Sequence, residues 1–182
     1  MRIEGKKLKK ISNKVNILES IDISISSDSI YGLLGPNGAG KTSLFSILAG
    51  LSKPSEGEVL YDSKIVNNLS FEKRSELGVI YLPQEPSVFR ELTVEENIKA
   101  ALEAKKFEKK EIDNKFTRIS EEFDLMGIKT QKCNSLSGGQ RRRVEIARAI
   151  ALNPKLILLD EPFAGIDPLI INEIKTLIKN LK

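Results

Sequence analysis

The sequence has no histidine, no tryptophan and a single cysteine, and only 5% of its 182 residues are aromatic. One cysteine, Cys133, excludes an internal disulfide and suits a reducing cytoplasm. Without a histidine to activate it, this thiol is better interpreted as a bystander than as a nucleophile. No apolar run approaches the roughly 18 residues that a membrane span needs, and residues 1–6 lack the apolar core of a secretory signal. We therefore expect a cytoplasmic chain with no span of its own.

The positive charge of the chain is modest and scattered. The formal net charge is +4, and the basic residues gather near residues 6–10, 105–110 and 141–143, with a single aromatic residue, Phe107, inside these runs. Such a pattern favours solvated faces and the handling of anionic ligands over nucleic-acid binding. With 40% hydrophobic residues, the length is enough for one domain with a real core.

Hydrophobic patterning predicts an alternation of strands and helices. Ile21, Ile23 and Ile25 alternate with polar residues, as in a half-buried strand, and the apolar residues 30–34 predict a buried strand. Thr93 and Glu96 have the spacing of a capping box at a helix start. The other expected strands are 58–61, 78–82 and 155–160, and the expected helices are 43–49, Thr93 to about Lys106, 109–125, 139–152 and 168–181. This order predicts an α/β core, residues 1–84 and 140–182, with a helical insertion over residues 85–139.

A glycine-rich loop carries the strongest chemical signal. Residues 35–42 fit the phosphate-binding pattern G-x-x-x-x-G-K-[ST] without a mismatch, between an expected strand and an expected helix. Glycines allow main-chain N–H groups to wrap a phosphate, and the helix that follows directs its positive end at the same anion. Lys41 would reach the β- and γ-phosphates of ATP, and Thr42 would ligate Mg²⁺. The predicted nucleotide-binding residues are Gly35, Asn37, Gly38, Ala39, Gly40, Lys41, Thr42 and Ser43.

Two acids follow the apolar residues 156–159. Asp160, at the end of the expected strand, would hold Mg²⁺ through water, and Glu161 would polarise the attacking water. Solvent exposure alone would also explain an Asp-Glu pair after a strand, but together with the glycine-rich loop the pair favours catalysis.

Residues 136–140, Leu-Ser-Gly-Gly-Gln, resemble the signature of ATP-binding cassette (ABC) proteins. A plain helix cap would explain Ser137. In this interpretation it would leave the two glycines and the glutamine unexplained. The resemblance implies a P-loop NTPase (RecA-like) core with a helical signature subdomain, and a head-to-tail homodimer that sandwiches two ATP molecules. The signature residues that would contact the opposite subunit's ATP are Ser137, Gly138, Gly139 and Gln140.

Two further roles are implied by the same resemblance. Gln84 is similar to the family's catalytic loop glutamine, which contacts Mg²⁺ and links the nucleotide to the transmembrane partner, although a lone glutamine is normally a surface residue. Asp167, in the stretch 164–167, resembles the family's D-loop and would help to join the two subunits. An acid in a turn before Pro168 is the alternative.

One branch of the family matches in more detail. Residues 81–85, 87–90, 137–148 and 160–168 resemble the ATPase subunits of lipopolysaccharide exporters, more closely than those of branched-chain amino-acid importers. In that branch, residues matching Phe89 and Arg90 line a groove that accepts coupling helices from two membrane subunits, which implies a peripheral location on the cytoplasmic face of the inner membrane. A buried phenylalanine next to a solvated arginine remains the alternative.

The sequence also departs from the family. The family's switch histidine follows the D-loop helix, and this chain has no histidine and lacks the later strands of the usual cassette. The position of the family's adenine-stacking aromatic falls near Ser12, and no aromatic residue precedes Tyr31. We therefore expect nucleotide binding with low turnover by this chain alone. The competing functions are a non-hydrolysing binding module and a soluble ABC protein of ribosomes or DNA.

Overall fold

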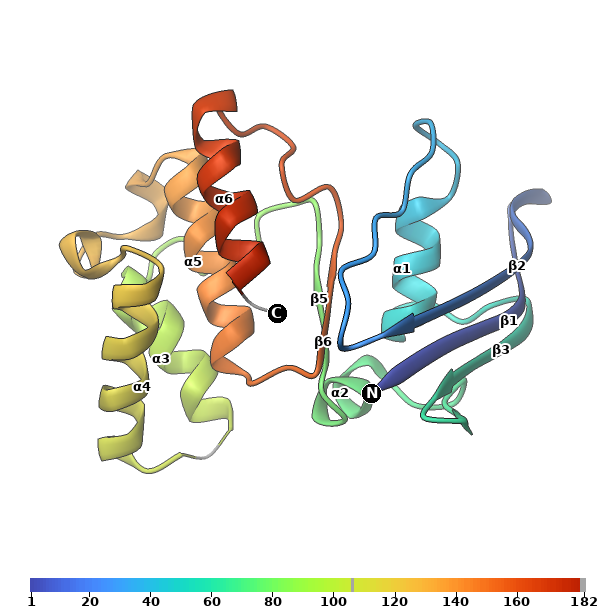
Figure 1. Ribbon diagram of the computed structural model, residues 1–182, viewed down its shortest axis with the longest axis horizontal. Helices are drawn as coiled ribbons and strands as arrows, with labels where there is room; N and C mark the ends of the chain where they lie inside the picture. Colours follow the sequence, from blue (N-terminus) through green and yellow to red (C-terminus); the bar gives the residue numbers. More distant parts are fainter. Residues whose placement is uncertain (106, 181–182) are drawn as a thin grey trace. The chain divides into compact units, whose positions relative to one another are not determined.

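The computed structural model describes residues 1–105 and 107–180, which pack into two compact units (Figure 1). The first unit contains residues 1–81 and 155–160, and the second contains residues 82–154 and the described residues from 161 onward. Within the described residues, the chain therefore passes from one unit to the other three times, the third time between Asp160 and Glu161.

The first unit is built on a four-stranded antiparallel sheet. Two neighbouring residues with positive φ, Asn13 (48°) and Lys14 (64°), form the two-residue turn that joins its first two strands, as the twist of a tight hairpin requires. Ile23 lies in the second strand, which confirms the strand predicted from the alternating isoleucines. The strands, in the order β2-β1-β3-β4, are β1 (Arg2–Ser12), β2 (Val15–Ser26), β3 (Glu56–Tyr61) and β4 (Lys64–Ile65).

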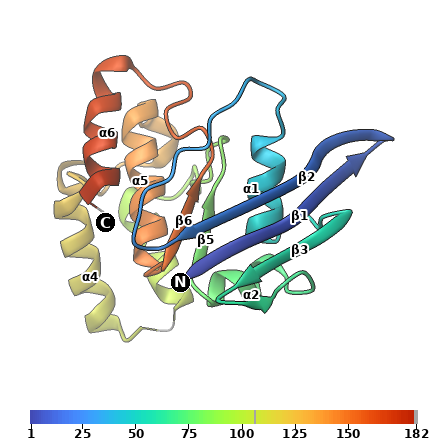
Figure 2. The same cartoon turned by 45° about the vertical axis from the view of Figure 1, so that its right-hand side comes forward.

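Helix α1 (Lys41–Ala49) packs on this sheet, where it contacts β1 and β2 (Figure 2). Its Ile47 and Leu48 belong to the buried cluster formed with the sheet. The far end of α1 is held by the buried Arg74 of α2 (Phe71–Glu76), which donates to the carbonyls of Ile47 and Leu48 at 2.8 and 3.0 Å. A cation at the carboxyl end of a helix satisfies its last carbonyls and opposes the negative end of its dipole.

A second, two-stranded sheet contains β5 (Val79–Leu82) and β6 (Leu156–Leu159), both predicted from the sequence. Val79 and Leu158 join the buried cluster of the first unit. The predicted buried strand over residues 30–34 is wrong: these residues are not in a strand, and Leu34 is 93% exposed. In the described part of the chain no strand pairs with this run, and an extended segment without a ladder partner leaves its main chain to solvent.

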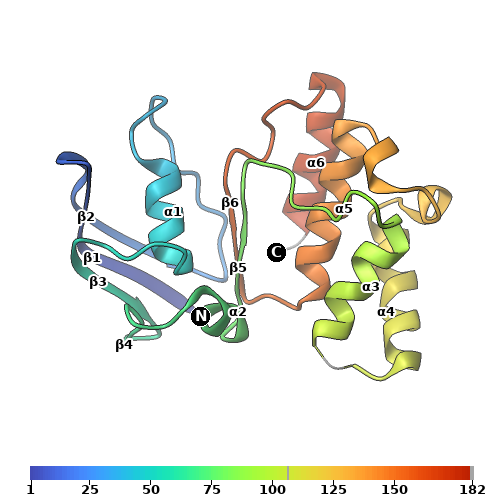
Figure 3. The ribbon, with the colours of Figure 1, turned by 180° about the vertical axis from the view of Figure 1, so that it is seen from behind.

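The second unit is helical (Figure 3). Thr93 and Glu96 form the predicted capping box, since each side chain bonds the main chain of the other. The expected helix ends at Lys106 and Leu181 lie outside the described residues. The 85–139 boundary of the helical insertion stays a prediction, and α3, α4 and α5 pack against one another. The helices are α3 (Val94–Ala104), α4 (Lys109–Glu122), α5 (Gly138–Ala151) and α6 (Pro168–Asn180), with short turns η1 (Met126–Ile128) and η2 (Cys133–Ser135).

Candidate functional site

The glycine-rich loop leads into α1 through two positions that only glycine fits. Gly38 and Gly40 have φ of 81° and 88°, a region that side chains with a Cβ rarely adopt. A Cβ on Gly40 would lie 2.7 Å from the carbonyl oxygen of Ile17 and 2.7 Å from the side chain of Leu18, both in β2. The end of the loop therefore sits directly on the backbone of the sheet, which fixes where α1 starts.

The start of α1 presents hydrogen-bond donors. The first intrahelical bond runs from Leu44 N to Gly40 O at 2.9 Å, so the amides of Lys41, Thr42 and Ser43 have no acceptor inside the helix. The Lys41 ammonium folds over its own loop and donates to the carbonyls of Gly35 and Pro36, both at 2.9 Å. Residues 35–43 contain no acidic side chain. A cation, orphan amides and a helix N-terminus without opposing acids suit a polyphosphate.

Asp160, the acid at the end of β6, is 1% exposed and is fixed by a tyrosine that sequence reasoning missed. The hydroxyl of Tyr81 donates to Oδ2 of Asp160 at 3.1 Å. Burial, together with the charge of Asp160 and this hydrogen bond, raises the pKa of Tyr81 to about 12, whereas a hydrogen bond with the Ser46 side chain lowers it. The tyrosine therefore stays protonated near neutral pH and remains a donor to the carboxylate.

Ser46, which is hydrogen-bonded to Tyr81, lies on the same helix as Thr42, the candidate Mg²⁺ ligand of α1. Thr42 and Ser46 are four residues apart in α1 and so share one face of the helix. The Thr42 hydroxyl thus lies on the face that turns toward Tyr81 and Asp160. Hydroxyl and carboxylate oxygens are the ligands that Mg²⁺ prefers. Within residues 1–105 and 107–180, no three His, Cys, Asp or Glu side chains gather as a metal cage.

The signature residues lie at the start of α5, in the second unit. Ser137 is the N-cap of α5: its hydroxyl accepts from Gln140 N at 3.2 Å, and Gln140 Oε1 accepts from Ser137 N at 3.0 Å. A helix cap therefore accounts for the glutamine as well as the serine, contrary to the expectation from the sequence, and leaves only the glycines unexplained. A Cβ on Gly138 would lie 3.4 Å from Gly165 O, so the signature and the predicted D-loop are neighbours.

The loop that carries Gln84 is braced at both ends by a buried ion pair. Arg142 Nη1 lies 2.8 Å from Glu145 Oε2, and the two side chains are 7% and 3% exposed. Arg142 also donates to Pro83 O at 3.2 Å, and Glu145 accepts from Ser87 N at 2.8 Å. Gln84 itself is exposed between these anchors. From the sequence alone, Arg142 is one of three consecutive arginines, and nothing there indicates that it is buried.

The remaining predicted site residues lie in the second unit. Glu161 is exposed and has a φ of 42°, unusual for a residue with a side chain, and its carbonyl accepts from Ala164 N at 3.0 Å. Asp167 is exposed just before α6. Their roles, like that of Gln84, stay predictions.

Phe89 forms a half-exposed aromatic platform. Its ring is paired with Arg148 of α5, whose guanidinium carbon lies 4.7 Å from the ring centroid and whose Nη1 donates to Ser87 O at 2.6 Å. Phe89 is 52% exposed, so the alternative of a buried phenylalanine is wrong. Arg90 is exposed, and the cation next to the ring is Arg148, which stands 59 residues after Phe89. This pairing has no signal in the sequence.

Comparison with known proteins agrees with these motifs. The sequence profile described as ABC transporter matches residues 18–164. The chain is 45% identical over 167 residues to the lipopolysaccharide export system ATP-binding protein LptB of Haemophilus influenzae, covering 91% of this chain and 69% of that protein. It is 40% identical over 181 residues to LptB of Escherichia coli K12, covering 99% of this chain and 75% of that protein.

Solved structures of ATP-binding cassettes have the same fold. One of MJ1267, an ATP-binding cassette of an ABC transporter, is 30% identical with a TM-score of 0.87, covering 98% of this chain and 76% of its own. The dimeric post-hydrolysis structure of the cassette MJ0796, bound to ADP and Pi, is 28% identical with a TM-score of 0.86, covering 98% and 82%. Among the described residues of this chain, no helix combines the length and apolar character of a membrane span.

Proposed function

Because the chain belongs to the ABC transporter family of ATP-hydrolysing subunits, we propose that it powers the export of lipopolysaccharide from the inner membrane. The observation that carries this substrate is the similarity to LptB proteins, which extends over nearly the whole chain. The glycine-rich loop and Asp160, which belong to one compact unit, support the nucleotide chemistry.

In this proposal the loop captures the phosphates of ATP by an exchange of partners. The Lys41 ammonium leaves the carbonyls of Gly35 and Pro36, which it contacts at 2.9 Å, and donates to the β- and γ-phosphates instead. The orphan amides at the start of α1 complete the cradle. Thr42, Asp160 and Gln84 would hold Mg²⁺, which neutralises charge on the phosphates when it is bound.

Hydrolysis then requires an oriented water and a second subunit. Glu161 accepts a proton or a hydrogen bond from the attacking water. Ser137, with the amides of Gly138 and Gly139 at the start of α5, would cover the γ-phosphate held by the other copy of a head-to-tail homodimer. Asp167 would contribute to the join between the copies.

The exposed Phe89 would contact the membrane partners. An aromatic ring held on one side by Arg148 and half exposed on the other suits the apolar face of a short helix. We propose that Phe89 and Arg90 receive coupling helices from two membrane subunits, which places this chain at the cytoplasmic face of the inner membrane.

Reconstitution tests this function. The chain is co-expressed with the two membrane subunits of a lipopolysaccharide exporter, the complex is purified, and ATP-driven release of lipopolysaccharide from proteoliposomes is measured. We expect release that Lys41→Ala abolishes and that Phe89→Ala reduces by weakening assembly. Failure to assemble with these subunits, together with assembly with those of a branched-chain amino-acid importer, would reject lipopolysaccharide as the cargo.

A second candidate function is a nucleotide-binding module with slow turnover. We expect purified chain to bind ATP and to hydrolyse it slowly in a steady-state phosphate-release assay. A rate typical of ABC ATPase subunits, abolished by Glu161→Gln, would reject this candidate.

A further inference from the structure

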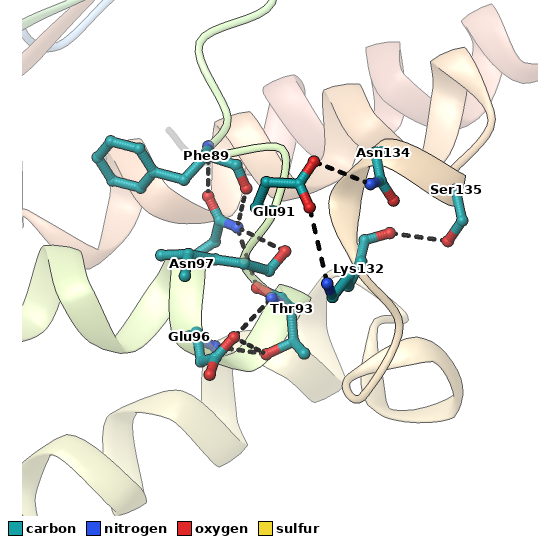
Figure 4. A network of polar contacts seen from close by, with 9 residues as sticks. Phe89, Glu91, Thr93, Glu96, Asn97, Lys132, Asn134 and Ser135 are labelled. Atoms are coloured by element: carbon teal, nitrogen blue, oxygen red, sulfur yellow. Dashed lines mark hydrogen bonds and ion pairs between the residues drawn. The ribbon is translucent and has the colours of Figure 1, made fainter.

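One buried side chain holds the main chain of Phe89 at both of its polar groups. Asn97, 0% exposed, lies in the first turns of α3. Its Oδ1 accepts from Phe89 N at 2.9 Å, and its Nδ2 donates to Phe89 O at 2.9 Å (Figure 4). The same amide nitrogen also lies within 3.3 Å of Leu92 O and 3.0 Å of Thr93 O. These hydrogen bonds fix the backbone of Phe89, whose aromatic ring is exposed.

Asn97 also reaches the segment that leads into the signature. Its Nδ2 lies 3.2 Å from the sulfur of Cys133, which is fully buried. The Cys133 amide in turn donates to Leu92 O at 3.0 Å, and the Asn134 amide donates to Arg90 O at 2.9 Å. These contacts tie the loop that follows Phe89 to the turn η2.

Further contacts join the segment after Phe89 to the segment before η2. Thr93 and Lys132 form an antiparallel bridge, and Val94 N donates to Gln131 O at 3.0 Å. At the surface, Glu91 lies 3.6 Å from the Lys132 ammonium and accepts from Asn134 Nδ2 at 3.2 Å, as Figure 4 shows. We call residues 89–95 and 129–134, joined in this way, the strap.

The strap ends next to the signature. The turn η2 (Cys133–Ser135) is followed by Leu136 and then by Ser137, the N-cap of α5. Leu136 is buried, so little free chain separates the strap from the signature serine. A displacement of Phe89 and the strap would reach the start of α5 through hydrogen bonds and two residues of backbone.

The contacts of Asn97 are not explained by the needs of its own helix. The start of α3 already has a complete capping box from Thr93 and Glu96, and asparagine is a poor residue for a helix interior. Its side chain serves the loop and the η2 turn instead. A buried amide that loses its partners is costly, so separating the loop from the turn would carry this cost.

We propose that Asn97 is a positioning residue that couples the exposed Phe89 to the signature serine, Ser137. The inference rests on the proposed function, in which Phe89 meets a membrane subunit and Ser137 meets the ATP of the second copy. A change at either end is transmitted through the strap to the other, with Asn97 as the shared hydrogen-bonding partner.

Hydrogen–deuterium exchange read by mass spectrometry tests the coupling in the full chain carrying Glu161→Gln, which slows hydrolysis. The probe is MgATP, and the two peptides cover residues 86–92 and 136–141. We expect MgATP to slow exchange in both peptides, by about tenfold in 136–141, where the copies meet. Adding Asn97→Asp, which keeps Oδ1 and removes both Nδ2 donors, should retain the response of 136–141 and abolish that of 86–92. Asn114→Asp, the same substitution on the exposed face of α4, should leave both responses unchanged.

The outcomes distinguish a failure of the ATP-sandwiched dimer from a failure of the coupling. If MgATP protects neither peptide, the ATP-sandwiched dimer is rejected, and the coupling with it. If 136–141 is protected while 86–92 does not respond, or responds equally with Asn97→Asp, the coupling alone is overturned. If Asn97→Asp does not fold, Glu91→Ala replaces it, because this exposed residue bridges the strap at the surface. We expect Glu91→Ala to halve the response of 86–92, and an undiminished response would again overturn the coupling.

Discussion

Replacing Gly40 by alanine should destabilise the chain through two separable effects. The first is conformational, since a Cβ at a φ of 88° costs about 1–2 kcal/mol. The second is steric, since that Cβ would lie 2.7 Å from Ile17 O in the backbone of β2, which cannot move without disturbing the sheet. Forced overpacking of this kind costs about 1–3 kcal/mol. We expect Gly40→Ala to lower the free energy of unfolding by about 2–5 kcal/mol in total.

Gly38→Ala supplies the matched control. Gly38 has a φ of 81°, yet no atom lies within 4 Å of its ideal Cβ, so only the conformational cost of about 1–2 kcal/mol applies. Urea unfolding of the nucleotide-free proteins, followed by circular dichroism, measures both variants. With a slope of about 1–3 kcal/mol per molar, the midpoint of Gly40→Ala should fall about 1 M below that of Gly38→Ala. Coincident midpoints would refute the contact between the loop and β2.

Three further predictions address the nucleotide site and the brace. Lys41→Ala should weaken ATP binding at least about tenfold, because a charge-assisted hydrogen bond contributes about 1.5–3 kcal/mol; unchanged affinity by calorimetry would reject the loop as the phosphate site. Tyr81→Phe removes the donor to Asp160 and should weaken ATP binding about fivefold or more in Mg²⁺ but not in EDTA; equal losses in a fluorescent-nucleotide titration would contradict a role at the metal. Glu145→Gln leaves Arg142 buried without its counter-charge and should cost about 3–5 kcal/mol. Its melting temperature should then fall by about 6–20 °C, and a variant that melts like the parent would count against the brace.

Local chemistry explains what could be predicted from the sequence. The phosphate loop, the capping box at Thr93 and the strand before Asp160 each depend on residues that are neighbours in the chain. Glycine positions, cap spacing and hydrophobic periodicity act within a few residues, so their structural consequence is written in the order of the amino acids. The same reasoning failed at residues 30–34, where an apolar run is necessary for a buried strand but a pairing partner is also required.

The contacts that order the site come from distant parts of the chain. Asp160 is held by Tyr81, Phe89 is paired with Arg148, and Asn97 reaches Cys133. No periodicity or motif connects these residues, because each pair meets only when separate elements pack together. The order of the amino acids is enough to predict a phosphate-binding loop, an acid after a strand and a helix that starts at the signature. The side chains that hold these features in place became evident only in the folded chain, since hydrogen bonds and burial depend on distance in space rather than along the chain.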